Sequence, residues 1–246
     1  MCIIGPAIDL DDRLAALLAA ENQAFAMLKK IEERGFIRPG RTEKEIEQDI
    51  LTLAETEFGV TQHWHKKIVR AGINTIAVFS DNPPARTIEN DDVVFLDLGP
   101  VFENWEADVG KTYAIGNDPA KHALVAELSR QFILVKAKLE DEPDITGANL
   151  FQYAKDCASS AGWIFGGAIA GHIVAEFPHA RLPGERQVHH ISPENPLSLS
   201  ALDPLGRKRY WIIEIHLVSP DGKFGGFYER LADGHCGDSD ALSASS

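Results

Sequence analysis

Residues 91–99 read DDVVFLDLG, an apolar run in which a single acid, Asp97, follows four apolar residues. Apolar runs without alternation are typical of strands that are buried on both faces of a sheet. An ionised carboxylate in such a strand needs a partner, because burying an unpaired charge is costly. This stretch therefore predicts a buried strand that carries a functional acid.

A second acid, Asp108, follows a predicted turn within residues 102–104. If the turn is centred between Phe102 and Glu103, the two strands pair antiparallel and Asp97 lies directly opposite Asp108, with Cβ atoms about 5 Å apart. The turn contains no glycine, which leaves this register open by a residue or two. We expect this hairpin to place two carboxylates side by side.

A second hairpin is predicted around Asp221-Gly222, which lies between the strand-like runs WIIEIHL and GGFYERL. The dipeptide is typical of a two-residue type I′ turn. The resulting register places Glu214 opposite Glu229, unless the two glycines of GGFYERL form a bulge. Each hairpin would then hold a pair of carboxylates.

Two such pairs would each keep one group protonated unless a cation lies between them. The alternative is that these acids are exposed or pair with Lys111 or Arg230, although no basic residue interrupts either apolar run. Four carboxylates suit two divalent ions, which two-metal hydrolytic sites hold about 3.5–4 Å apart. His172, which follows the glycine-rich run GGAIAG, is the best candidate for a fifth ligand.

The other histidines are weaker candidates. His63 and His65 alternate on one face of a predicted strand, but nothing else in their segment is a metal ligand. His189 and His190 lie in a stretch rich in Pro and Ser, and we expect them to be solvated.

The whole chain predicts an α+β arrangement in the order helices, strands, helices, strands. Apolar periodicity and capping signals predict helices at residues 10–36, 42–57, 119–139 and 145–161. Runs of β-forming residues predict strands at 59–69, 75–80, 93–98, 163–169, 209–218 and 226–231. We expect a single domain over residues 1–246, with its core at about 10–235 and a flexible tail at 237–246.

Composition and charge exclude several classes of function. The chain has 246 residues, of which 44% are hydrophobic and 25% charged, with a net charge of −13. These values are ordinary for a globular protein and unfavourable for binding nucleic acid or an anionic membrane. Three cysteines without a Cys-x-x-Cys pair favour a reducing compartment, so we predict a cytoplasmic protein. A homodimer is left open.

The sequence resembles the pita-bread metallopeptidases over about residues 10–235. That family includes methionine aminopeptidase, Xaa-Pro aminopeptidase, prolidase and the metal-free creatinase. Its five ligand positions are matched, in order, by Asp97, Asp108, His172, Glu214 and Glu229. The resemblance implies a pita-bread fold, in which two pseudo-symmetric α/β halves surround a curved antiparallel sheet.

The resemblance also implies a dinuclear metal-dependent hydrolase that cleaves an amide bond, as an Xaa-Pro aminopeptidase-like or dipeptidase-like enzyme acting on short peptides. By resemblance, Asp97 would hold one ion, and His172 with Glu214 the other. Asp108 and Glu229 would bridge the two. Oxygen-rich ligands favour manganese, with cobalt, iron and zinc as alternatives.

In the same family, Glu214 would transfer a proton from the attacking water, and a second histidine, here His179 in GHIVAEFPH, would stabilise the oxyanion. Two positions depart from the family pattern. Phe79 stands where a substrate-contacting histidine is usual, and Ala168 stands where the Xaa-Pro and prolidase branch has another. These departures leave open a hydrolase of non-peptide amides or amidines. A non-catalytic binding module is a further alternative, because some relatives keep the fold as a protein-interaction domain, although such relatives typically lose ligands that this chain keeps.

Overall fold

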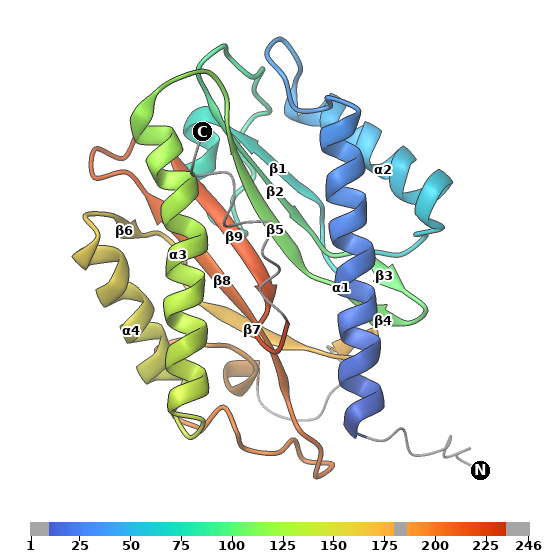
Figure 1. Ribbon diagram of the computed structural model, residues 1–246, viewed down its shortest axis with the longest axis vertical. Helices are drawn as coiled ribbons and strands as arrows, with labels where there is room; N and C mark the ends of the chain where they lie inside the picture. The colour runs from blue at the N-terminus through green and yellow to red at the C-terminus, as the bar shows by residue number, and fades with distance from the viewer. Residues whose placement is uncertain (1–9, 180–185, 235–246) are drawn as a thin grey trace.

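The computed structural model describes residues 10–179 and 186–234 (Figure 1). A seven-stranded antiparallel sheet lies at the centre, α1 and α3 cross its front face in this view, and α2 and α4 lie toward its two edges. None of the helices in these ranges is long and apolar enough to cross a membrane. The predicted tail at 237–246 lies outside the described residues.

The four long helices agree with those predicted to within a few residues. The second shows why: Thr42 caps its first turn in a capping box with Glu45, and Gly59 ends it with a φ of 65°. The helices are α1 (Leu10–Glu33), α2 (Glu43–Phe58), α3 (Pro119–Asp141) and α4 (Gly147–Ser160).

The sheet has the strand order β1-β2-β5-β9-β8-β6, and β7 also pairs with β8. Two long hairpins, β2/β5 and β8/β9, meet at the centre where β5 pairs with β9. The strands of this sheet are β1 (Ile68–Ala71), β2 (Val93–Leu98), β5 (Val109–Ala114), β6 (Ile164–Phe165), β7 (Gly171–Val174), β8 (Tyr210–Val218) and β9 (Gly225–Leu231). A separate small hairpin joins β3 (Val101–Phe102) to β4 (Trp105–Glu106).

The hydrophobic core is divided between two halves of the chain. One core lies among α1, α2, β1, β2 and β5, and another lies among α3, α4, β7 and β8. Each half therefore repeats the order of two helices followed by strands, as the predicted α+β architecture with two similar halves requires. Helix α3 packs on β8, β9 and β5, which covers the junction between the halves.

The predicted register of the first hairpin is wrong by two residues. Glu103 and Asn104, with φ values of 49° and 71°, form the centre of the turn, so the turn lies one residue later than expected. Asp97 consequently pairs with Gly110 rather than with Asp108. A turn with two positive φ values usually contains glycine, and Asn104 takes this conformation because its short side chain tolerates it.

The predicted register of the second hairpin is confirmed, since Glu214 lies opposite Glu229. Pairing continues without a bulge to Val218 and Gly225. The turn type is different from the prediction, because a type I′ turn needs two positive φ values and only Gly222 of the central dipeptide has one, at 67°.

Three predicted strands are wrong over most of their length. Only the last residues of 59–69 enter β1, and only Ile164–Phe165 of 163–169 is a strand. The segment 75–80 begins inside a short 3₁₀ helix at Gly72–Ile76 and continues without strand structure. Their β-forming residues include Trp64, His65 and Phe79, whose side chains line a cavity. Contacts around that cavity, rather than strand pairing, account for these residues.

Candidate active site

Four neighbouring strands place one row of residues across the middle of the sheet. Asp97 pairs with Gly110, Gly110 with Glu229, and Glu229 with Glu214. Directly paired residues of antiparallel strands point to the same face, so the three carboxylates converge. A Cβ at Gly110 would lie 2.9 Å from the Glu229 Cβ and 2.6 Å from the ring of Phe227, so only glycine fits between them.

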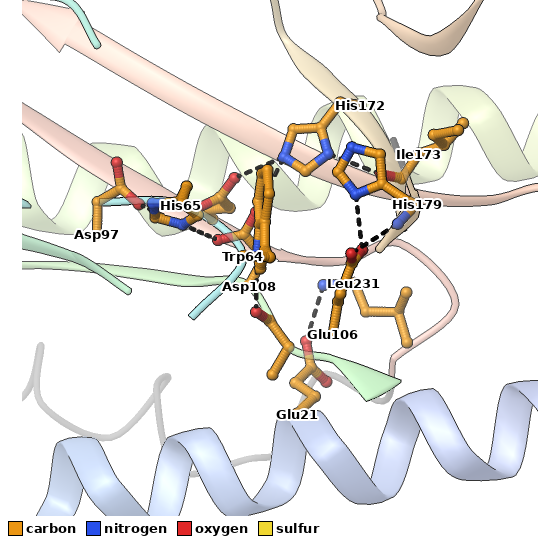
Figure 2. A network of polar contacts seen from close by, with 12 residues as sticks. Glu21, Trp64, His65, Asp97, Glu106, Asp108, His172, Ile173, His179 and Leu231 are labelled. Atoms are coloured by element: carbon orange, nitrogen blue, oxygen red, sulfur yellow. Dashed lines mark hydrogen bonds and ion pairs between the residues drawn. The ribbon is translucent and has the colours of Figure 1, made fainter. Parts of the chain in front are cut away.

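Asp108 and His172 complete the set of five residues predicted as metal ligands. Asp108 precedes β5 and is almost fully buried, and His172 reaches it from β7. The Nε2 atom of His172 lies 2.9 Å from Asp108 Oδ2 and 3.5 Å from Glu229 Oε1. Its Nδ1 atom lies 2.8 Å from the carbonyl oxygen of Ile173, which leaves Nε2 as the nitrogen that faces the acids (Figure 2).

His65 also belongs to this group, although the sequence indicates it only as a weaker candidate for a metal ligand. Its Nε2 atom lies 3.2 Å from Asp108 Oδ1 and 3.4 Å from Asp97 Oδ1 (Figure 2). The acids come from other strands, so the lack of a ligand within its own segment was the wrong criterion. Two groups of described residues have donor atoms close enough to share an ion. One is His65, Asp97 and Asp108, and the other is Asp108, His172 and Glu229. His63 belongs to neither group.

Burial sets the electrostatics of three of the acids. It raises the pKa of Glu214 to about 8 and the pKa of Glu229 well above its ordinary value. It raises the pKa of Asp97 to about 6, although the His65 ring opposes that shift. Neighbouring carboxylates add to each increase, because like charges disfavour ionisation.

Asp108 behaves differently because two imidazole rings contact it. Burial alone would raise its pKa, but His65 and His172 lower it to about 2. Burial opposes protonation of His65, yet Asp97 and Asp108 raise the pKa of this ring to about 9. Asp108 is therefore the centre of negative charge in the cluster.

The residues present fit divalent cations. Oε1 of Glu214 and Oε2 of Glu229 are buried and have no hydrogen-bond partner within residues 10–179 and 186–234. Buried polar atoms without partners are rare in native proteins and call for a missing partner. Two divalent ions would neutralise the four carboxylates and would accept these oxygens as ligands.

His179 lies beside the cluster and is oriented by an acid that the sequence did not indicate. Its Nδ1 atom lies 2.7 Å from Glu106 Oε2, and its backbone N–H donates to Glu106 Oε1 at 2.8 Å (Figure 2). The ring stacks on that of His172 with centroids 5.9 Å apart. Glu106 is almost fully buried on β4, so it fixes the ring and leaves Nε2 of His179 for another partner.

Trp64 holds the three imidazole rings in place. Its ring centroid lies 4.3 Å from that of His65, 5.0 Å from that of His172 and 4.9 Å from that of His179. Its indole N–H donates to the carbonyl oxygen of Ala107 at 3.2 Å, which anchors it next to β5. The β-forming residues of 59–69 are the only signal for Trp64 in the sequence, and they predict a strand rather than this role.

A cavity of about 420 Å³ opens over the row of acids. Phe79 and Ala168, the two departures from the family pattern, both line it, and Phe79 is 55% exposed. His190 lines it as well and His189 is buried, so the expectation that these two histidines are solvated is wrong. Apolar side chains form much of the wall: Ile68, Val78, Phe95, Ile169 and Phe227.

Comparisons with known proteins agree with this geometry. The chain is 29% identical to an Xaa-Pro dipeptidase of Lactobacillus helveticus over 128 residues, which are 52% of this chain and 34% of that protein. It is 28% identical to an Xaa-Pro dipeptidase of Lactobacillus delbrueckii subsp. lactis over 168 residues, covering 63% of this chain and 44% of that protein. The chain thus spans less than half the length of these curated relatives.

Solved structures confirm the predicted pita-bread fold. A prolidase from Thermococcus sibiricus superimposes with a TM-score of 0.64 at 23% identity, covering 90% of this chain and 56% of that one. A methionine aminopeptidase from Thermotoga maritima superimposes with a TM-score of 0.66 at 16% identity, covering 93% of this chain and 99% of that one. The sequence profile described as metallopeptidase family M24 matches residues 15–225. Since that match spans most of the chain, the resemblance seen in the sequence is confirmed, and the protein belongs to metallopeptidase family M24.

Proposed function

We propose that this chain is a dinuclear metal-dependent hydrolase that removes the amino-terminal residue from short peptides, with Xaa-Pro peptides among its substrates. The observation that carries the proposal is the row of buried acids with two unpartnered oxygens, on Glu214 and Glu229, at the floor of a cavity. The Xaa-Pro dipeptidase names of the curated relatives support the choice of substrate. Manganese is the proposed metal, because most of the donors are carboxylate oxygens.

The proposed ligands are Asp97 for one ion, His172 and Glu214 for the other, and Asp108 and Glu229 for both. His65, which contacts Asp97 and Asp108, is added as a candidate donor to the first ion. Bound divalent cations would polarise the scissile carbonyl and make the attacking water more acidic.

Two residues of the chain would handle the charge that develops during the reaction. Glu214 lines the cavity and has a buried oxygen without a partner in the described chain, so it can accept the proton of the attacking water. Glu106 holds His179 through Nδ1 and leaves Nε2 without a partner in the described chain, so an N–H at Nε2 would donate a hydrogen bond to the oxyanion. The apolar walls keep bulk water away and strengthen both interactions.

A second candidate function rests on Phe79 and Ala168. Both line the cavity where the resemblance implies histidines that contact a peptide. Hydrolysis of a non-peptide amide by the same acids would fit this more apolar pocket. A non-catalytic binding module is the remaining alternative, and it predicts neither metal-dependent turnover nor sensitivity to Glu214.

The test is digestion of a peptide library by the purified protein with and without manganese, after its metal content has been measured. We expect manganese-dependent release of amino-terminal residues. Glu214→Gln should keep the circular dichroism spectrum and lose most of the activity, because an amide cannot accept the proton and binds metal more weakly. Glu194→Gln, on an exposed residue outside the cavity, is the matched control and should remain active.

Near-normal turnover by metal-loaded Glu214→Gln would show that its role as the base is wrong. Metal binding without cleavage of any library peptide would favour the non-peptide amide hydrolase, which a panel of small acylated compounds would then detect. Failure to bind metal or to cleave any substrate would favour the binding module.

A further inference from the structure

One wall of the cavity carries a buried cation that the proposed reaction does not use. Arg70 lies on β1, is only 7% exposed and lines the same cavity as the acids. It pairs with Phe95 of β2, while Ile68 pairs with Asp97. Arg70 and Asp97 therefore share a face of the sheet and are offset by two residues along the strands, which is about 7 Å.

The protein satisfies little of the hydrogen-bonding capacity of this side chain. A guanidinium has five N–H donors and stays charged at any physiological pH. In the described part of the chain, Arg70 makes one such bond, from Nη2 to the backbone oxygen of Asp81 at 2.7 Å, and its buried Nε has no partner. The carboxylate of Asp81 accepts from the backbone N–H of Val78 instead.

No ion pair with a described residue neutralises Arg70. Arg230 is a useful contrast, because it is comparably buried and lies 3.9 Å from the carboxylate of Glu21. Burying a charge that has no partner costs on the order of several kcal/mol, even after the protein around it relaxes. A buried arginine that borders a cavity and lacks an internal counterion is therefore suited to an anion that enters the cavity.

The geometry points to Arg70 as the residue that binds a carboxylate group of the substrate. This inference rests on the proposed function and specifies its substrate class: short peptides with a carboxylate within about two residues of the scissile bond, since an extended chain spans about 3.3–3.6 Å per residue. The carboxylate can come from the side chain of an acidic amino-terminal residue or from the free carboxyl terminus of a very short peptide. A planar guanidinium recognises a carboxylate through two parallel hydrogen bonds, which gives direction as well as affinity.

The experiment compares two pairs of peptides that differ in one group, using manganese-loaded protein. Ala-Pro against Ala-Pro-amide tests the terminal carboxylate, and Glu-Pro-amide against Gln-Pro-amide tests the side-chain carboxylate. For each peptide, kcat/KM is measured where cleavage occurs and the dissociation constant is measured by calorimetry where it does not. Binding is thus scored even if the proposed peptidase function is wrong.

We expect the acid member of at least one pair to be preferred about 10- to 100-fold, the range for a charge-assisted hydrogen bond. Arg70→Gln should bring that ratio close to one by weakening the acid member, with little change for the amide. Arg70→Lys, which keeps the charge and loses the fork, should retain part of the preference. Arg41→Gln is the matched control, because Arg41 pairs with Asp49 outside the cavity, and it should retain the full ratio.

The pair that shows the preference identifies the source of the carboxylate. Ratios near one for both pairs in the wild-type protein would overturn the inference, as would a preference that survives in Arg70→Gln. Cleavage without a preference would reject the role of Arg70 and leave the proposed function intact. If the acid peptides bind preferentially but are not cleaved, the role of Arg70 is supported and the proposed function is rejected. If none of these peptides is bound or cleaved, both proposals are overturned.

Discussion

Without metal, the stability of this protein should fall as the pH rises from about 7 to about 9. Burial raises the pKa of Glu214 to about 8 from an ordinary value of 4.5. A carboxyl group whose pKa is higher in the folded state than in the unfolded state stabilises the fold at pH values below its unfolded pKa. That stabilisation is lost as the pH rises through its folded pKa. His65 acts in the same direction, because nearby acids raise its pKa from 6.5 to about 9.

Asp108 does not reverse this trend inside that window. The His65 and His172 contacts lower its pKa to about 2, so its contribution is present above its ordinary value of 3.8 and is lost only in stronger acid. Three partly or fully buried histidines oppose the fall at lower pH, because burial lowers the pKa of His63 to about 4 and also lowers the pKa of His190 and His216. These rings cost stability below their ordinary value of 6.5, so the metal-free protein should lose stability mainly between about pH 7 and 9.

The magnitude follows from the Glu214 shift. The difference between 4.5 and about 8 corresponds to an upper bound of roughly 5 kcal/mol, at about 1.4 kcal/mol for each pKa unit. Because the cluster shares its protons among several acids, we expect roughly half of this, about 2–3 kcal/mol. For a chain of this length that is a fall in Tm of about 5–10 °C.

The assay is thermal unfolding followed by circular dichroism at about pH 5, 7 and 9, with chelator and with excess manganese. Manganese should raise Tm, most of all at the highest pH, because it binds the ionised carboxylates of the folded state. Glu214→Gln should flatten the slope of the metal-free protein, and Glu194→Gln should not. A metal-free Tm that is constant across this window, or an unchanged slope in Glu214→Gln, would refute the reasoning.

Asp108→Ala or Glu229→Ala should lower the number of divalent ions bound per chain below about two in calorimetric titration, and wild-type stoichiometry in both would mean that the site is misplaced. Phe79→His should speed the cleavage of methionyl and Xaa-Pro peptides about 10- to 100-fold by restoring a hydrogen bond at the pocket edge. Wild-type efficiency equal to that of dedicated aminopeptidases, with no gain from the histidine, would contradict this. Glu106→Gln should lower kcat more than it changes KM, because the acid orients His179. In a His179→Ala background, Glu106→Gln should have no further effect, and a further loss there would show that Glu106 does not act through His179.

The second hairpin shows how much of the site a local signal can predict. The position of Asp221-Gly222 was enough to pair Glu214 with Glu229, even though the turn is not the expected type. Register depends on where the chain reverses, and several turn types reverse it at the same point. The sequence could therefore place this half of the site without predicting the backbone angles.

The first hairpin differs from the predicted register by two residues, yet both of its acids reach the site. Side chains alternate along a strand with a period of two, so a shift of two residues keeps every side chain on its face. Asp108 moved away from the position opposite Asp97, but both acids still face the cavity. A shift of one residue would have pointed Asp108 to the opposite face and removed the prediction.

His65, Trp64 and Glu106 were not predicted because their roles depend on contacts between distant segments. His65 contacts acids on β2 and just before β5, and Trp64 packs on the rings of His172 and His179 from a distant segment of the chain. Glu106 lies in the polar stretch NWEAD, which resembles an exposed turn, yet it is almost fully buried and contacts His179 from a distant segment. A single sequence has no local pattern that reports such contacts.

The site also explains why the two halves of the chain must join where they do. The first half supplies Asp97 and Asp108, and the second supplies Glu214 and Glu229, so neither half alone contains both pairs of acids. They meet at β5 and β9, where Gly110 leaves just enough room for Glu229. Concentrating four acids at this junction opposes its formation, since like charges repel when buried. A cation bound there reverses that repulsion, so metal binding and the association of the two halves should stabilise each other.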